Sequence, residues 1–352
     1  MARWWKLRFP IEIPAVENQE LEAEVWRRWN SLTKPPRSLG RLESLVTRLA
    51  LMQGMARPTV ERKLMVICCA DHGVTAEGVS AYPREVTAQM VLNFLRGGAA
   101  INVLCSQFGI TPMIVDAGVD GDVVAGVVDC RIGRGTANFA HGPAMTRAQV
   151  ERALENGMRL AREARERFDV AAVGEMGIGN TTAASALLCA YAGIDPGEAV
   201  GPGTGVSAEG VAHKAKVIGD AMARHREVIA SGDAVGILAA LGGFEIATMA
   251  GFLLGAASVR LPVVIDGFIS SAAALAAHAI DSMVLGFLVF SHLSSETAHR
   301  RLLNWLSVQP LLDLELRLGE GSGAALAMPI LDAAIALYSR MATFAEAGVA
   351  EE

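Results

Sequence analysis

The sequence has few charged and few aromatic residues, and its cysteines show no paired spacing. Charged residues make up 19% of the 352 residues, aromatic residues make up 5%, and the formal net charge is -6. A mildly acidic chain lacks the basic face that a phosphate backbone requires, so we expect no nucleic-acid partner. The five cysteines lie mostly in apolar runs without a C-x-x-C pair. This pattern indicates buried thiols in a reducing compartment and argues against disulfides or a zinc site.

The sequence also lacks a long hydrophobic run, and we expect no signal peptide in it. The first ten residues are basic, and Glu12 interrupts the apolar stretch that follows them. The longest weakly charged run, 246–259, is too short to cross a bilayer and ends at Arg260 and Pro262. We therefore expect a core helix over 246–259 and a cytoplasmic protein without a membrane partner.

Metal-binding motifs are missing as well. The sequence contains no H-E-x-x-H motif and no acidic pair with the spacing of metal ligands. We therefore expect neither a metal ion nor a bound cofactor.

What the sequence does have is a regular alternation of short apolar runs and longer helical patterns from residue 64 onward. This alternation predicts a doubly wound, Rossmann-like α/β fold, whose mostly parallel sheet carries helices on both faces. Ligands bind beyond the carboxyl ends of the strands in such sheets, so we expect one shared site there. Each glycine or polar residue at these ends is also compatible with an ordinary strand terminus. The runs expected as strands are 64–70, 112–115, 170–173, 262–265 and 284–290.

Both chain ends fall outside this alternation. Apolar residues at helical spacing predict helices over 20–32 and 42–55, and a closing helix is expected over 326–345. We expect the two ends to pack together as a small helical subdomain, so that the predicted division is 1–60 with 326–352, beside an α/β catalytic domain of 61–325.

The strongest local signal is Gly174–Thr182, which follows an expected strand and opens an expected helix over 183–191. Its glycines let a ligand approach the backbone, and a helix start offers unpaired N–H groups and the positive end of a dipole. Asn180, Thr181 or Thr182 can cap that helix or bind a phosphate oxygen. The stretch matches neither the P-loop nor the dinucleotide-binding loop. It indicates a site for a phosphomonoester, and the alternative is an ordinary glycine turn.

Two charged residues near glycine-rich loops are further candidates for such a site. Lys214 lies on an expected helix just beyond a second glycine-rich loop, Gly201–Gly205. It supplies the compact positive charge that suits a phosphate, unless it is merely solvated. Glu320 lies between glycines in Leu318–Gly323, where an exposed, closely approachable backbone presents a carboxylate. Such a group can accept a proton from a bound ring N–H, and the alternative is a solvated glutamate in a glycine-rich loop.

Three histidines follow expected strands without a partner of metal-ligand spacing. His72 begins a loop that runs to Pro83, and His292 and His299 follow the last expected strand. Single histidines at such positions are typical of hydrogen-bonded structural residues, and we interpret all three in this way.

Taken together, these segments resemble the nicotinate-nucleotide–dimethylbenzimidazole phosphoribosyltransferase family of cobalamin biosynthesis over roughly residues 15–345. The most specific matches are Gly174–Thr182 and Gly319–Gly323. Two residues depart from the family pattern, because Arg37 stands in place of glycine and Tyr82 in place of phenylalanine. The other matching segments are 34–36, 38–43, 70–74, 77–80, 116–119, 201–205, 266–268 and 318–324.

The resemblance implies that the phosphoribosyl group passes from nicotinate mononucleotide to 5,6-dimethylbenzimidazole. The products are α-ribazole 5′-phosphate and nicotinate, and a single displacement inverts the anomeric carbon. The resemblance also implies Glu320 as the general base. The implied nucleotide contacts are Glu175, Gly177, Gly179, Asn180, Thr181, Thr182, Gly203 and Lys214, and the implied benzimidazole contacts are Ser80, Tyr82, Gln89 and Leu318.

The resemblance further implies a homodimer. The N-terminal helices with Trp26 and Trp29 supply either an interface or their own core. Two other functions stay open from the residues alone. A non-catalytic sensor would bind nicotinate mononucleotide without releasing nicotinate. An NAD-dependent oxidoreductase would need G-x-G-x-x-G after the first strand, where this chain has Asp71-His72-Gly73.

Overall fold

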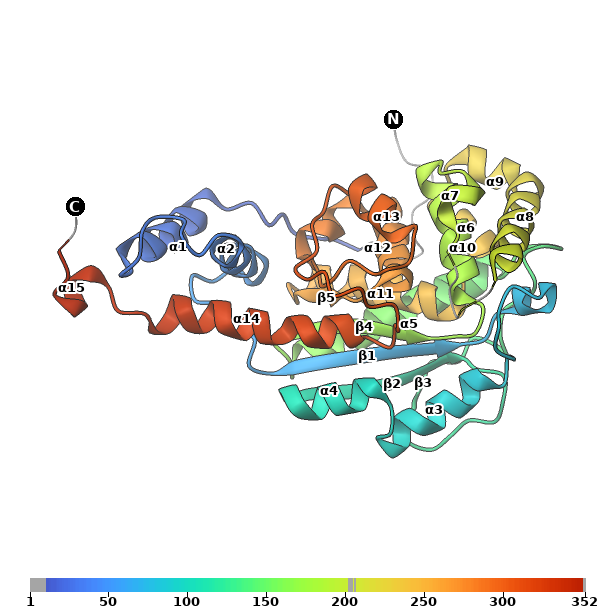
Figure 1. The fold of residues 1–352 in the computed structure, drawn as a ribbon, viewed down its shortest axis with the longest axis horizontal. Coiled ribbons are helices and arrows are strands. Elements are labelled where there is room, and N and C mark those ends of the chain that lie inside the picture. Colours follow the sequence, from blue (N-terminus) through green and yellow to red (C-terminus); the bar gives the residue numbers. More distant parts are fainter. Residues whose placement is uncertain (1–10, 202–204, 206, 351–352) are drawn as a thin grey trace.

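The computed structural model describes residues 11–201, 205 and 207–350. Its centre is a six-stranded parallel sheet in the order β3-β2-β1-β4-β5-β6 (Figure 1). The chain winds outward from β1 to one edge and then from β4 to the other, which confirms the doubly wound α/β fold. The strands are β1 (Lys63–Ala70), β2 (Ile110–Gly118), β3 (Val128–Asp129), β4 (Val170–Met176), β5 (Val263–Ile265) and β6 (Leu288–Phe290).

Four expected strands overlap β1, β2, β4 and β5, of which β2 and β4 are longer than predicted, and the fifth expected strand was too long. Only Leu288–Phe290 of the run 284–290 forms a strand, because the residues before it belong to the 3-10 helix η2 (Ser282–Phe287). An unbroken apolar run does not distinguish a buried helical turn from a buried strand. The two-residue strand β3 is too short to leave a pattern in the sequence.

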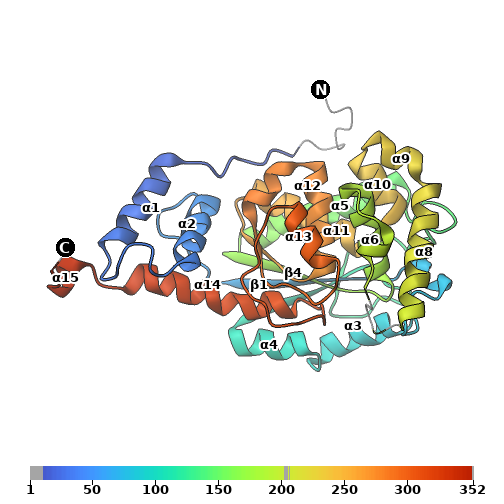
Figure 2. The same ribbon diagram turned by 45° about the horizontal axis from the view of Figure 1, so that its top comes forward.

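Helices cover both faces of the sheet, as predicted (Figures 1 and 2). One face is covered by α3 (Val86–Arg96), α4 (Ala100–Phe108) and α14 (Ser322–Arg340), and the other by α11 (Phe244–Ser258) and α12 (Phe268–Ile280). Further helices are η1 (Gly73–Glu77), α5 (Arg147–Arg165), α6 (Asn180–Ala192), α7 (Pro196–Ala199), α8 (Ala208–Arg224), α9 (Arg226–Ser231), α10 (Ala234–Leu241), α13 (His299–Trp305) and α15 (Phe344–Ala347).

Helix α11 is the predicted core helix, and α5 packs closely along it. A Cβ on Gly157 would lie 2.0 Å from the carbonyl oxygen of Thr248, and one on Gly251 would lie 2.2 Å from that of Leu154. Glycine at both positions therefore allows the two backbones to touch, which closes one side of the core.

The two chain ends pack together, as both views of the ribbon show (Figures 1 and 2). Helices α1 (Gln19–Ser31) and α2 (Arg41–Gln53) lie against the outer half of α14. The rings of Trp29 and Tyr338 lie 4.9 Å apart, and Arg28 donates hydrogen bonds to backbone carbonyls of Tyr338, Ser339 and Met341. The predicted boundary at residue 326 falls inside α14, whose first half packs on the sheet, and the division into two domains stays a prediction.

One helix among the described residues, α14, is long and apolar enough to cross a membrane by length and composition. Half of the most apolar stretch of α14 is buried in the protein. The helix packs there against the sheet, α2 and α4. It is therefore a core helix of this fold. All five cysteines are free and buried, which confirms the prediction of buried thiols.

Candidate active site

A cleft of about 760 Å³ opens at the carboxyl ends of β4, β5 and β6. Its walls come from the turn after β4, the residues that follow β5 and β6, the loop before α14, and α3. A parallel sheet binds its ligands at this edge. The lining segments are 175–178 with 180–181, 267–269, 292 with 294 and 296, 315–320, and Tyr82 with Val86 and Met90.

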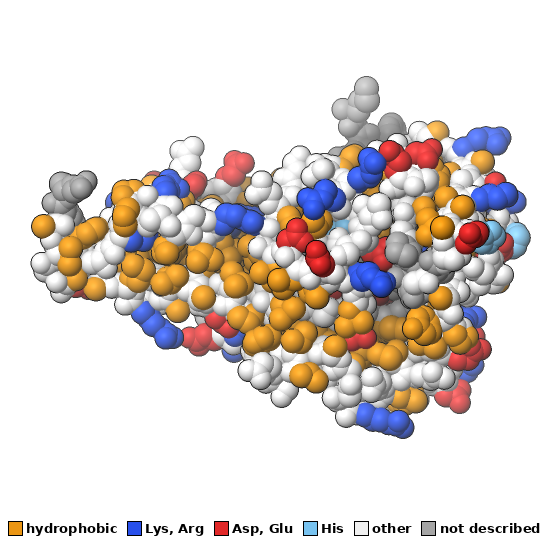
Figure 3. Space-filling model, viewed as in Figure 1, with side chains coloured by type: hydrophobic (Ala, Val, Ile, Leu, Met, Phe, Trp, Pro, Cys, Tyr) orange, Lys and Arg blue, Asp and Glu red, His pale blue; other side chains and the backbone are white. Residues whose placement is uncertain are grey.

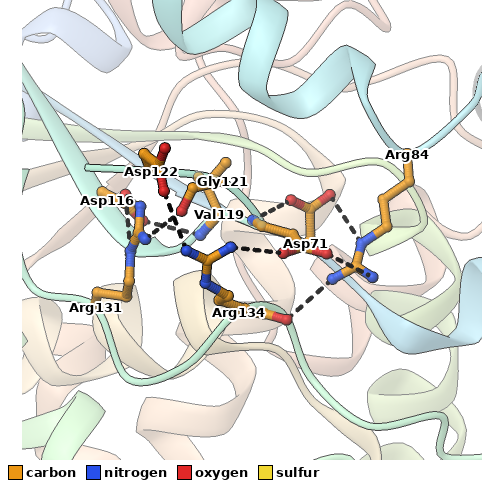
Figure 4. Close-up of polar contacts among 9 residues, drawn as sticks. Asp71, Arg84, Asp116, Val119, Gly121, Asp122, Arg131 and Arg134 are labelled. Atoms are coloured by element: carbon orange, nitrogen blue, oxygen red, sulfur yellow. Dashed lines mark hydrogen bonds and ion pairs between the residues drawn. The ribbon is translucent and has the colours of Figure 1, made fainter. Parts of the chain in front are cut away.

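The ends of β1 and β2 do not line this cleft, so the expectation that all five strand ends share one site was wrong. Their carboxylates are held by arginines instead (Figure 4). Arg131 binds Asp116, while Arg84 contacts Asp71 at 3.5 Å and Asp120 at 3.2 Å. Because Arg84 lies two residues after Tyr82, this network anchors the segment that carries Tyr82 into the cleft.

The glycines in β4 and in the turn after it are required by close contacts. A Cβ on Gly177 would lie 2.4 Å from the carbonyl oxygen of Ala70, and one on Gly174 would lie 2.6 Å from that of Glu320. Gly179 has a φ of +95° and precedes α6 as its N-cap residue, without a capping side chain. Of the two roles predicted for Asn180, Thr181 or Thr182, capping this helix does not occur, because α6 already begins at Asn180. Binding of a phosphate oxygen stays a prediction.

These three side chains have separate surroundings. Asn180 donates a hydrogen bond from Nδ2 to the Glu175 carboxylate, and Thr181 Oγ1 accepts one from Lys214 Nζ at 3.2 Å. Both Asn180 and Thr181 line the cleft. Thr182 is fully buried, and its hydroxyl has no hydrogen-bond partner among the described residues. The structure therefore brings Asn180 and Thr181, but not Thr182, to the cleft.

Lys214 is a buried side chain and not a solvated one. It lies on α8 with 2% of its surface exposed and reaches the cleft through Thr181. Burial lowers the pKa of Lys214, and the nearby Glu296 carboxylate raises it. A buried ammonium beside a cleft is a suitable partner for an anionic ligand.

Glu320 is buried, although the sequence predicted an exposed loop. Its φ is +63°, and its neighbours Gly319 and Gly321 also have left-handed backbones. One carboxylate oxygen, Oε2, has no hydrogen-bond partner within the described ranges. Burial raises the pKa of Glu320, a backbone hydrogen bond from Ile101 lowers it, and the Asp266 carboxylate raises it. The structure thus holds a carboxylate with proton-accepting capacity at the wall of the cleft.

Glu175 lies beside Glu320 at the end of β4. A Cβ on Gly319 would lie 2.5 Å from Glu175 Oε1, so the glycine leaves room for this side chain. Burial, together with the Asp266 and Glu245 carboxylates, raises the pKa of Glu175 to about 8, although the hydrogen bond from Asn180 lowers it. Glu175 is therefore largely protonated in the empty protein at neutral pH.

This protonation makes the stability of the empty protein depend on pH. Between the ordinary pKa of 4.5 and about 8, the folded protein retains a proton at Glu175 that the unfolded chain has released. The stabilisation is complete below the ordinary pKa and is lost as pH rises through the folded value. We expect Glu175→Gln to raise the melting temperature more at about pH 9 than at about pH 5. A difference in melting temperature that is the same at both pH values would contradict this.

Only two of the four expected benzimidazole contacts line the cleft. Tyr82 and Leu318 line the cleft and are 54% and 57% exposed. Ser80 lies off its wall and accepts a hydrogen bond from the Tyr82 backbone at 3.3 Å, and Gln89 is exposed on α3. Gly203 lies outside the described residues.

The apolar wall of the cleft was not predicted from the sequence. Val86 and Met90 of α3 and Phe268 of α12 line it, together with Met176 and Ile178. In the sequence these side chains are indistinguishable from core residues, and only their position at the carboxyl edge identifies them. They form a surface that suits a flat aromatic ring.

The histidines mostly have the structural roles that were predicted. His72 is fully buried, and its Nε2 lies 2.7 Å from Glu245 Oε1. His299 binds Ser271 and accepts a hydrogen bond from the backbone of Ser294. His292 differs from these two because it lines the cleft.

The close contact at Gly177 gives a test of this part of the site. Gly177→Ala would press a methyl group on the backbone of β1 and should lower the free energy of unfolding by about 1–3 kcal/mol. Gly219→Ala is the matched control, because Gly219 lies inside α8 with open space around it and alanine favours a helix. Urea unfolding should separate the two variants, and equal stability would contradict the described contact.

Comparison with known proteins agrees with this architecture. A phosphoribosyltransferase family model matches residues 14–349. The nicotinate-nucleotide–dimethylbenzimidazole phosphoribosyltransferase of Solidesulfovibrio magneticus is 51% identical over 326 residues, which is 92% of each chain. The enzyme of the same name from Pseudomonas fluorescens is 51% identical over 340 residues, or 96% of each chain.

The fold is shared with solved structures. The crystal structure of CobT from Thermus thermophilus superposes with a TM-score of 0.90 at 46% identity, covering 95% of this chain and all of that one. A second Thermus thermophilus structure, titled as the nicotinate-nucleotide–dimethylbenzimidazole phosphoribosyltransferase, gives 0.89 at 45% identity, with 96% and 100% coverage. With half of the residues identical over nearly the whole length, the chain belongs to the nicotinate-nucleotide–dimethylbenzimidazole phosphoribosyltransferase family.

Proposed function

We propose that this soluble enzyme transfers the phosphoribosyl group of nicotinate mononucleotide to 5,6-dimethylbenzimidazole, for assembly of the cobalamin nucleotide loop. The products are α-ribazole 5′-phosphate and nicotinate. The observation that supports this most directly is that one cleft holds both a phosphate-binding turn and a buried carboxylate. The turn after β4, with the buried Lys214 behind it, suits a phosphate, and Glu320, in the loop before α14, lines the same cleft together with apolar side chains.

The nucleotide is bound at the turn after β4. Its phosphate lies at the start of α6, where Thr181 and Lys214 supply a hydroxyl and an ammonium. Asn180 and Glu175 lie next along the wall and face the ribose. A protonated Glu175 can donate a hydrogen bond to a ribose hydroxyl, and Asn180 fixes its orientation. The groups that hold the nucleotide are thus separate from the group that accepts the proton.

The benzimidazole binds between Glu320 and the apolar side chains of α3. One ring nitrogen attacks the anomeric carbon while the other carries a proton. As positive charge builds on the ring, that N–H becomes acidic, and the Glu320 carboxylate accepts its proton. Nicotinate leaves with the bonding electron pair on its ring nitrogen, which becomes neutral. Attack from the face opposite the leaving group inverts the β-nucleotide to the α-product.

An assay for nicotinate release tests the proposal against its alternatives. The purified protein is incubated with nicotinate mononucleotide, with and without dimethylbenzimidazole, and the products are separated by chromatography. We expect nicotinate only when the base is present. A sensor would release none, and an oxidoreductase would instead oxidise or reduce an added nicotinamide dinucleotide.

We also propose a homodimer in the cytoplasm. Apolar side chains gather on one face over α14, α4 and α3 (Figure 3), and Val103 of α4 is 61% exposed. Trp29 is buried in its own chain, and Trp26 is covered by the Arg37 guanidinium 3.3 Å from its ring centre. The two tryptophans therefore pack within one subunit, and the apolar face is the better interface. Analytical ultracentrifugation should give twice the mass of the chain, and a monomer at micromolar concentration would contradict this.

A further inference from the structure

Asp266 lies directly after β5, beneath the wall of the cleft. It is 1% exposed and does not line the cleft itself. Its Oδ2 accepts a hydrogen bond from the backbone N–H of Gly321 at 3.1 Å, and its Oδ1 accepts one from Ala324 at 3.0 Å. Both donors belong to the start of α14, so Asp266 binds the beginning of a helix 55 residues further along the chain.

These N–H groups have no partner within their own helix, because the first turn of any helix leaves its N–H groups unpaired. The N-cap of α14 is Gly321, which has no side chain to accept them. The Asp266 carboxylate takes that role from another strand, and its negative charge suits the positive end of a 19-residue helix. Asp266 is therefore the cap of α14.

The capped turn is the one that carries Glu320. Three consecutive residues, Gly319, Glu320 and Gly321, have left-handed backbones with φ of +82°, +63° and +91°. This conformation is disfavoured for a residue with a Cβ, so contacts from outside must hold Glu320 in it. The backbone of Gly174 in β4 lies close against that of Glu320, without room for a side chain between them, and Asp266 binds the next N–H along the chain.

The charges around this turn come from several elements. Glu175 faces Glu320 from β4, the start of α4 faces it at Ile101, and His292 Nδ1 lies 3.9 Å from Asp266 Oδ1. Burial raises the pKa of Asp266, whereas His292 and the backbone N–H groups of α14 lower it. Because those N–H groups are donors, the arrangement suits a charged Asp266. That charge in turn raises the pKa of Glu320 and keeps it a stronger base.

We infer that Asp266 is a positioning residue for the transfer reaction, which fixes the backbone of the turn 319–323 so that the Glu320 carboxylate faces the incoming base. This inference rests on the proposed role of Glu320. Asp266 does not line the cleft and acts through the turn that it caps.

Two substitutions separate the geometry from the charge. In Asp266→Asn the amide nitrogen would face a backbone N–H, so one cap bond is lost together with the charge. We expect kcat to fall about 10- to 100-fold, with little change in KM for either substrate, because a small displacement of a catalytic group costs this much. The acidic limb of the pH profile should also move to lower pH. Asp266→Glu keeps the charge but displaces the turn, so kcat should fall without that shift.

A double-mutant cycle tests whether Asp266 acts through Glu320. If it does, adding Asp266→Asn to Glu320→Ala should cause almost no further loss of kcat. The matched control is Asp195→Asn, the same chemical change at the exposed cap of α7, which should leave kcat unchanged. Melting temperatures show whether each variant is folded.

The outcomes distinguish this inference from the proposed function. Near-normal turnover in Glu320→Ala would remove the proposed general base itself. Independent, multiplying losses in the double variant, with Glu320→Ala still impaired, would overturn only the positioning role of Asp266. A rise in KM with unchanged kcat would do the same. Failure of both Asp266 variants to fold would make Asp266 a general core residue and would also overturn the inference.

Discussion

Replacing Glu320 by alanine should lower kcat by about 10²- to 10⁴-fold, the usual contribution of a general base. Binding of nicotinate mononucleotide should change little, because we propose that the turn after β4 and Lys214, and not Glu320, hold the nucleotide. Single-turnover kinetics with dimethylbenzimidazole measure the chemical step, and calorimetric titration with the mononucleotide measures binding.

The control for this variant is Asp313→Ala, which removes a carboxylate from the same loop at an exposed position outside the cleft. It should keep normal turnover. If Glu320→Ala also turned over normally, the assignment of the base would be wrong, and if it lost nucleotide binding, Glu320 would belong to the other half of the site.

Replacing Lys214 by methionine should raise KM for nicotinate mononucleotide by about 10- to 100-fold. A hydrogen bond to a charged group contributes about 1.5–3 kcal/mol, and each 1.4 kcal/mol is a factor of ten in affinity. Without substrate the variant should be at least as stable as the wild type, because a buried ammonium whose described hydrogen-bond partner is a single hydroxyl is costly and methionine is not. Steady-state kinetics and thermal unfolding measure the two effects.

Lys216 offers a matched control on the same helix. It is 73% exposed and pairs with Asp220 at 2.6 Å, so Lys216→Met should leave KM unchanged. Equal rises in KM for both variants would indicate a general loss of positive charge near the cleft. A fall in the stability of Lys214→Met with normal KM would show that Lys214 serves the fold and not the phosphate.

The alternation of apolar runs and helical patterns predicted the doubly wound sheet, because buried parallel strands need continuous apolar residues. It could not predict β3, which pairs over two residues only, or η2, whose apolar run resembles a strand. The start of α6 was also misplaced. The sequence predicted a helix over 183–191, whereas α6 begins at Asn180, directly after Gly179.

At the site, the sequence indicated which residue types are present but not which way each side chain points. Thr182 and Thr181 are adjacent and identical in chemistry, yet helical geometry turns one into the core and the other into the cleft. The burial of Lys214 and Glu320 depends on elements far away in the chain. The cap that Asp266 provides to α14 is invisible in the sequence, because it joins residues 55 positions apart.

The measurement that tests the central claim most directly is identification of the product by NMR after incubation with nicotinate mononucleotide and dimethylbenzimidazole. A single displacement predicts the α-anomer of ribazole 5′-phosphate, formed in equal amount with nicotinate. The β-anomer would contradict inversion by a single displacement, and nicotinate without any ribazole phosphate would contradict phosphoribosyl transfer itself.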